Sequence, residues 1–140
     1  MSFDVLGDLN WWAVIVATVA YWILGAIWYA QAVFGKAWLR AGGIEIQEGQ
    51  RPGASVIIVP LIANFLAVVA TGMLAVATSS TDAADALVLG AVVWAGYVIG
   101  LTLLGATFDN RPNAPLWFTI NVAYHLIGLL GAALIVTLWD

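Results

Sequence analysis

The string NVAYHLIGLLG (121–131) contains the single histidine of the chain, inside a long apolar run. An imidazole can relay a proton or hydrogen-bond a ligand, and an ionisable side chain within a membrane-spanning run is a functional-site hypothesis by default. Asn121 lies four residues before His125, so both side chains share one face of a helix. The Asn121–His125 face is therefore the first candidate for a site.

Other polar side chains fall at a similar depth in the neighbouring apolar runs. At about 1.5 Å per helical residue, Asn121 and His125 lie roughly 9 and 15 Å from the start of their run, which adjoins a basic loop. Asn64 lies about 13 Å from the start of its own run, which also follows a basic loop. By the same count, Thr102 lies about 9 Å and Tyr97 about 16 Å in. One hypothesis is therefore a shared polar ligand site, formed by Trp28, Tyr29, Asn64, Tyr97, Thr102, Asn121 and His125.

Three roles stay open for His125. As a structural strut, a neutral imidazole would hydrogen-bond Asn64 or Tyr97 on a neighbouring helix, which contributes about 0.6 kcal/mol per bond in a membrane. As part of a ligand or ion site, it would face a cavity. As a proton relay, it would exchange protons with a neighbouring group.

Several catalytic and metal-dependent functions are excluded by residue type. The apolar runs contain no Asp, Glu, Lys or Arg, so the membrane carboxylate of a small proton-coupled cation exporter is missing. One histidine and no cysteine cannot supply the three or four ligands of a zinc site. The acid nearest to His125 is Asp109, outside the run, so we predict neither catalytic residues nor a metal site. Lipid, quinone or carotenoid binding needs few polar groups and stays open.

The composition is that of a membrane protein. Of 140 residues, 64% are hydrophobic and 9% charged, whereas soluble domains carry about a quarter charged residues. The net charge of −4 argues against nucleic acid as a partner. Each apolar run exceeds the roughly 20 residues needed to cross a bilayer, and Asn10, Asp82 and Asn113 are expected N-caps. We predict a single all-α membrane domain over 1–140, a four-transmembrane-helix bundle with spans Trp11–Phe34, Ser55–Ala77, Ala86–Phe108 and Pro115–Trp139.

Basic residues predict the orientation of the spans. Lys36, Arg40 and Arg51 lie in the loop 35–54, Arg111 lies between the last two spans, and neither terminus carries Lys or Arg. Basic loops stay in the cytoplasm, so both termini are expected on the non-cytoplasmic side. A short interfacial helix is expected around Ala37–Arg40.

Small residues predict how the helices associate. Ala63, Ala67, Thr71 and Ala75 form a stripe at i+4 spacing, Gly96 and Gly100 form a GxxxG pattern, and Gly128 lies in the last span. Such stripes pack helices within one chain or between chains. Trp22 and Trp94 lie near mid-depth, where each indole N–H needs a partner, and we expect them to fill space between the first and third spans.

The strings GAIWYAQAVFGKAWLR (25–40) and NVAYHLIG (121–128) resemble the DUF1761 family of bacterial membrane proteins. The matching residues are Gly25, Trp28 and Tyr29, then Phe34, Gly35 and Trp38, and then Asn121, Tyr124 and His125. The resemblance implies a four-span fold and a location in the bacterial inner membrane, and it carries no activity. It also implies that the end of the first span and the Asn121–His125 face belong together.

Two functions follow as hypotheses. The first is a non-enzymatic protein that acts through helix packing, as a homo-oligomer or as an accessory subunit of a larger membrane assembly, with membrane lipids as its other partners. The second is a module that binds or passes a small solute or a hydrophobic ligand at the polar site.

Overall fold

The computed structural model describes residues 2–47 and 49–139, and in this part of the chain the regular structure is helical. Three helices are long and uninterrupted: α1 (Trp11–Trp28), α3 (Ser55–Ala77) and α6 (Ala114–Leu138). A further continuous helix consists of α4 (Ala83–Val93), the π-helical segment η3 (Trp94–Ile99) and α5 (Gly100–Phe108). These four helices are long and apolar enough to cross a membrane, which confirms an all-α fold with four candidate spans.

The expected caps start three of these helices. Asn10 accepts hydrogen bonds from the backbone N–H groups of Trp12 and Ala13 at 3.1 and 3.2 Å. Asp82 accepts from the N–H of Asp85 at 2.9 Å, and Asn113 accepts from that of Leu116 at 3.2 Å. Each cap satisfies N–H groups that a helix N-terminus leaves without an intrahelical partner.

The first span ends earlier than the apolar run. Helix α1 stops at Trp28, and Ala30 is extended (φ −63°, ψ 143°) before the π-helical turn η2 (Gln31–Gly35) leads into α2 (Lys36–Gly42). A Cβ atom at Gly35 would overlap the carbonyl oxygen of Tyr29, so only glycine fits where the chain folds back. The short helix expected around 37–40 is therefore present as α2, and the stretch that follows α1 belongs to a bend.

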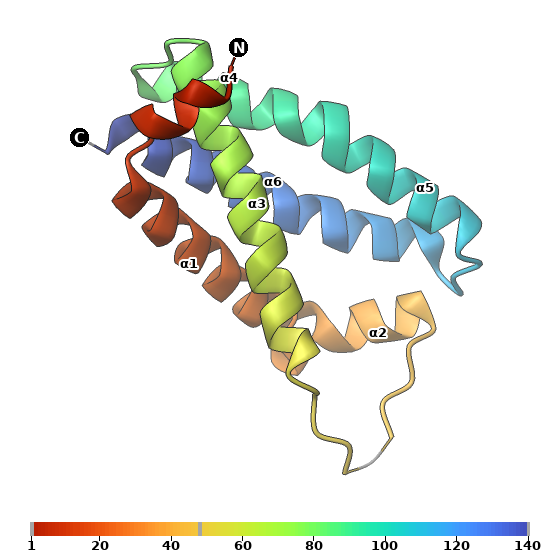
Figure 1. Cartoon of the computed structure of the whole chain (residues 1–140). Helices are drawn as coiled ribbons and strands as arrows, with labels where there is room; N and C mark the ends of the chain where they lie inside the picture. Colours follow the sequence, from red (N-terminus) through yellow and green to blue (C-terminus); the bar gives the residue numbers. More distant parts are fainter. Residues whose placement is uncertain (1, 48, 140) are drawn as a thin grey trace.

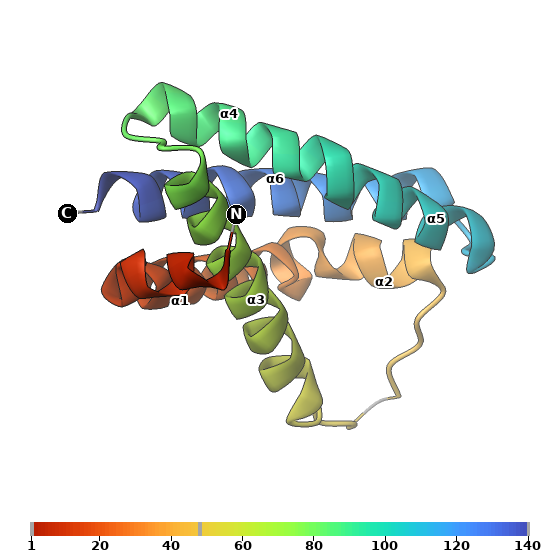
Figure 2. The same cartoon turned by 45° about the horizontal axis from the view of Figure 1, so that its top comes forward.

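Helix α6 lies at the centre of the molecule. Figure 2 shows it between α4–α5 on one side and α1 with α2 on the other, and α3 crosses both α1 and α6 (Figure 1). The first half of α3, residues 55–63, leaves the bundle and is exposed. The N- and C-terminal ends lie near the same end of the helices (Figure 1). Before α1, the 3₁₀-helix η1 (Phe3–Asp8) packs on α3.

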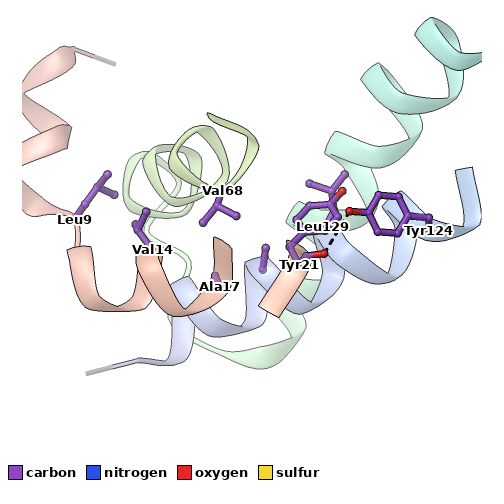
Figure 3. Close-up of a cluster of buried hydrophobic side chains, with 8 residues drawn as sticks. Leu9, Val14, Ala17, Tyr21, Val68, Tyr124 and Leu129 are labelled. Atoms are coloured by element: carbon purple, nitrogen blue, oxygen red, sulfur yellow. Dashed lines mark hydrogen bonds between the residues drawn. The ribbon is translucent and has the colours of Figure 1, made fainter. Parts of the chain in front are cut away.

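The core is narrow and is built where α1, α3 and α6 meet. Figure 3 shows its buried side chains, which are Leu9, Val14, Ala17, Tyr21, Val68, Tyr124, Leu129 and Ala132. In the apolar stretch of α6, 39% of the residues are buried, against 6% in the stretch formed by α4, η3 and α5. Most of the third span is therefore exposed, although α4 packs closely along α6.

Candidate functional site

Two tyrosines and two glycines lock α1 against α6. Tyr21 of α1 lies on Gly128 of α6, where a Cβ atom would overlap the tyrosine ring. In return, Tyr124 of α6 lies on Gly25 of α1, where a Cβ atom would come within 2.8 Å of the tyrosine hydroxyl oxygen. The two ring centroids are 5.4 Å apart. The pattern Tyr-x3-Gly thus occurs once on each helix, in opposite directions, and each tyrosine fills the space left by the other helix's glycine.

Hydrogen bonds extend this contact to α3 and to the histidine. The hydroxyl of Tyr21 lies 2.6 Å from Nδ1 of His125. The hydroxyl of Tyr124 donates to the carbonyl oxygen of Tyr21 at 3.3 Å and accepts from Nδ2 of Asn64 at 3.2 Å (Figure 3 shows the bond between the tyrosines). Three helices are therefore joined through polar atoms in the core.

A second group of bonds joins the end of α1 to the first turns of α6. Tyr29 donates to Oδ1 of Asn121 at 2.8 Å, and Nδ2 of Asn121 donates to the carbonyl oxygen of Trp117 at 2.7 Å. Nε1 of Trp28 donates to the carbonyl oxygen of Ile120 at 3.1 Å. Both Oδ1 and Nδ2 of Asn121 are therefore hydrogen-bonded, and the side chain joins α1 to α6.

Aromatic rings from the bend after α1 complete this region. Phe34 packs on Trp28 with ring centroids 4.6 Å apart, and Trp38 packs edge-on against Tyr29 at 5.2 Å. Tyr29 in turn meets Tyr124 at 5.2 Å. The two stretches 25–40 and 121–128, distant in the sequence, therefore form one continuous cluster.

A groove of about 470 Å³ opens beside the polar core, between α3 and η3. Its polar lining comes from Tyr21, Asn64 and His125 at the base, with Thr71 beside them. The α3 wall includes three alanines, at 63, 67 and 70, and the opposite wall is formed by Val93, Tyr97 and Val98. Small side chains on α3 thus leave a space that is apolar along its walls and polar at its base.

The predicted site residues divide into three groups by position. The structure brings Trp28, Tyr29, Asn64, Asn121 and His125 into one hydrogen-bonded cluster. Tyr97 lies on the wall of the groove with its side chain 67% exposed. Thr102 lies on α5, outside the residues that line the groove.

Tyr21 and Tyr124 are the residues that the depth count missed. The expected partners of His125 were Asn64 or Tyr97, but its hydrogen-bond partner is Tyr21. A tyrosine followed four residues later by glycine occurs at 21–25 and at 124–128. This repeated spacing is the sequence signal that could have paired the two helices.

The two mid-depth tryptophans do find partners, but not between the first and third spans. Nε1 of Trp22 donates to the carbonyl oxygen of Ile57 on α3 at 3.2 Å. Nε1 of Trp94 donates to the carbonyl oxygen of Val122 on α6 at 2.7 Å. Each therefore fixes its span to a different neighbour from the one expected.

The small residues serve different surfaces. Ala63 and Ala67 border the groove, while Thr71 and Ala75 are buried, so the stripe on α3 continues from the groove into the core. Gly128 holds Tyr21, as described above. A Cβ atom added at Gly96 or Gly100 would have no neighbouring atom within 4 Å, so both glycines are open at the surface of the third span.

A family of known proteins matches nearly the whole chain. The model of the family described as a protein of unknown function, DUF1761, matches residues 12–137. The chain belongs to the DUF1761 family. No curated protein and no solved structure matches it. In this DUF1761 chain the motif residues of the two stretches, from Gly25 to Trp38 and from Asn121 to His125, are the ones that meet in the aromatic and hydrogen-bonded cluster.

The contacts of Tyr21 with Gly128 and of Tyr124 with Gly25, together called the interlock, predict that a methyl group added at either glycine destabilises the protein. Gly128→Ala and Gly25→Ala should each lower the free energy of unfolding by about 1–3 kcal/mol, the usual cost of overpacking. Gly131→Ala is the matched control on α6, because nothing lies within 4 Å of its Cβ position. Thermal unfolding of the purified protein in detergent, followed by circular dichroism, measures the difference. Equal stability of Gly128→Ala and Gly131→Ala would contradict the interlock.

The Tyr29–Asn121 hydrogen bond predicts a measurable coupling between α1 and α6. A double-mutant cycle with Tyr29→Phe and Asn121→Ala should give a coupling free energy of about 0.6 kcal/mol, the average for such bonds in membranes. The cycle of Tyr97→Phe with Asn121→Ala serves as the control, since Tyr97 lies on the groove wall. Steric-trap or denaturant unfolding in bicelles provides the energies. Additive effects in the first cycle would show that the bond does not join the helices.

Proposed function

We propose that this DUF1761 protein is a non-enzymatic binding module of the membrane, which takes a hydrophobic molecule from the bilayer into the groove between α3 and η3. One observation carries the proposal: a cavity of about 470 Å³ whose walls are apolar and whose base presents Tyr21, Asn64 and His125. Small-molecule sites are concave, mostly apolar and fixed by a few polar groups. Their volumes are about 300–1,000 Å³, and this groove falls in that range.

The surroundings of the groove favour entry from the side. Ala63 and Ala70 of α3 and Tyr97 of η3 are exposed at its rim, so its opening lies on the surface that lipid chains would cover. The base is closed by Tyr21 and Tyr124, which are 3% and 5% exposed and pack on each other. A closed base supports binding rather than passage of a solute through the bundle.

The proposed orientation places both termini outside the cytoplasm of a bacterium, in its inner membrane. The connections between the spans hold Lys36 and Arg40 in α2, Arg51 in the loop that follows it and Arg111 in the loop before α6, at the opposite end of the spans from the termini. The excess of basic residues in those connections supports a cytoplasmic position for them. Asn64 and His125 then face the groove from the cytoplasmic half or the middle of the bilayer.

Filling the groove tests the proposal. An alkane that carries a photoactivatable diazirine should label α3 and η3 in the purified protein, and unlabelled alkane should compete in a saturable manner. Ala67→Phe, which places a ring in the groove, should reduce the saturable labelling at least about tenfold, as expected when more than 1.4 kcal/mol of binding is lost. Mass spectrometry of the cleaved protein locates the label.

Ala91→Phe is the matched control for this experiment, because Ala91 is an exposed alanine of α4 that does not line the groove. Its labelling should match that of the unchanged protein. Labelling that is uniform over all lipid-facing helices, and that Ala67→Phe leaves unchanged, would refute a binding groove.

A second candidate function is helix packing against another subunit, either a second copy of the chain or a larger membrane assembly. The observation that favours it is the third span, where 6% of the apolar stretch is buried and where Gly96 and Gly100 are open. Closely spaced small residues let helix backbones approach each other in lipid.

Alanine substitutions test whether the third span packs against another subunit, because they separate loss of assembly from loss of stability of the single chain. Gly96→Ala, Gly100→Ala and Gly131→Ala all add a Cβ atom with no neighbour within 4 Å among the described residues, so none should destabilise the isolated chain. If the third span packs against another subunit, native mass spectrometry from lipid nanodiscs should show dissociation for Gly96→Ala and Gly100→Ala, while Gly131→Ala keeps the assembly. A 14.8 kDa monomer for all proteins, including the unchanged one, would refute self-association.

A further inference from the structure

Two polar side-chain atoms of residues that line the groove form no hydrogen bond within the described part of the chain, and the first belongs to His125. Its Nδ1 lies 2.6 Å from the Tyr21 hydroxyl. We assign the donor role to the tyrosine hydroxyl, whose hydrogen then has an acceptor, and the acceptor role to Nδ1. The imidazole proton then lies on Nε2, which becomes a hydrogen-bond donor.

Nε2 of His125 is open rather than sealed in the core. It forms no hydrogen bond within the described part of the chain, and it is absent from the buried side-chain polar atoms that lack a partner there. His125 is one of the residues that line the groove, so we assign Nε2 to that side. The histidine therefore offers an N–H donor to whatever occupies the groove.

The second unused atom is Oδ1 of Asn64. The amide nitrogen of this side chain donates to the Tyr124 hydroxyl at 3.2 Å, which orients the amide. Although Asn64 is only 5% exposed, its Oδ1 is likewise not among the buried unpartnered atoms of residues 2–47 and 49–139. Because Asn64 also lines the groove, we assign its Oδ1 as the acceptor that a molecule in the groove meets together with the histidine donor.

We infer that the groove binds an uncharged lipid alcohol, and this inference rests on the binding function proposed above. A hydroxyl group is the smallest group that both accepts and donates a hydrogen bond, so it can accept from Nε2–H of His125 and donate to Oδ1 of Asn64. The hydrocarbon part of such a lipid would lie along Ala63, Ala67 and Ala70. Long-chain prenols and diacylglycerols share this chemistry.

Charged lipid headgroups do not fit the same groove. Among residues 2–47 and 49–139, none of those that line it is a Lys, Arg, Asp or Glu. Asn64 and His125 lie about 13 and 15 Å along their helices, so a phosphate there would be buried without a counter-ion, which is costly. An ether or ketone would satisfy the donor of His125 and leave the acceptor of Asn64 unpaired.

The single histidine makes the inference directly measurable, because ¹⁵N-histidine labelling reports one imidazole. We would titrate the protein in lipid nanodiscs with 1-dodecanol, with its methyl ether and with dodecane. Without additive, the spectrum should show the tautomer protonated at Nε2. Dodecanol should shift the Nε2 resonance saturably, the ether should need an about tenfold higher concentration, and dodecane should leave the resonance unchanged.

Variants and extracted lipids complete the test. In Asn64→Ala, the alcohol and the ether should shift the Nε2 resonance at similar concentrations. Thr102→Ala changes a residue outside the groove lining, so it should keep the tenfold preference for the alcohol. Asn64 also hydrogen-bonds Tyr124, so Asn64→Ala can fail to fold. In that case the comparison of the three additives on the unchanged protein still tests the inference. Lipids extracted from the protein purified in polymer nanodiscs should be enriched in an uncharged alcohol, and their masses distinguish a prenol from a diacylglycerol.

The outcomes separate the two proposals. A tautomer protonated at Nδ1, an equal response to alcohol and ether, or enrichment of phospholipids alone would overturn the lipid-alcohol inference, while saturable alkane labelling of the groove would still support the binding function. Loss of saturable labelling together with an unchanged imidazole resonance in all three titrations would overturn both.

Discussion

The close approach of α1 and α6 is the constraint on which the rest of the structure depends. Lipid chains are as apolar as leucine side chains, so helices in a membrane associate through close packing and hydrogen bonds rather than through the hydrophobic effect. Gly25 and Gly128 remove two side chains at the crossing, and Tyr124 and Tyr21 fill the spaces. Either glycine alone would admit one ring. The reciprocal pair fixes the register of the two helices, and α6 can then serve as the support for α2, α3 and α4.

The same contact that holds the helices together also prepares the groove. Because Tyr21 is held on Gly128, its hydroxyl engages Nδ1 of His125, and because Tyr124 is held on Gly25, its hydroxyl engages Asn64. Each tyrosine therefore hydrogen-bonds one polar atom of a groove residue, and the second polar atom of that side chain, Nε2 or Oδ1, forms no hydrogen bond among the described residues. Stability and binding are therefore not separate features here, since the buried rings determine which way the imidazole and the amide present their remaining atoms.

Much of this arrangement follows from the sequence, and the parts that do not follow have a common cause. Helical rise gives depth along a span, so it placed Asn64, Asn121 and His125 in the same half of the bundle. Depth does not give the direction in which a residue faces, so it could not exclude Thr102 or pair His125 with Tyr21. The early end of α1 coincides with a close backbone approach, that of Gly35 to the carbonyl of Tyr29 six residues before it, and hydropathy records contacts no better than it records directions.

The third span shows how one local irregularity serves two surfaces. Between Trp94 and Ile99 the helix adopts π-helical bonding, which adds a residue to the turn and changes the direction of the side chains that follow. Trp94, at its start, donates to Val122 of α6, while Tyr97 and Val98 in the same segment line the groove. A regular α-helix separates neighbouring side chains by about 100°, which a wider turn alters. The one segment of this span that departs from α-helical bonding thus both donates a hydrogen bond to α6 and supplies part of the wall of the groove.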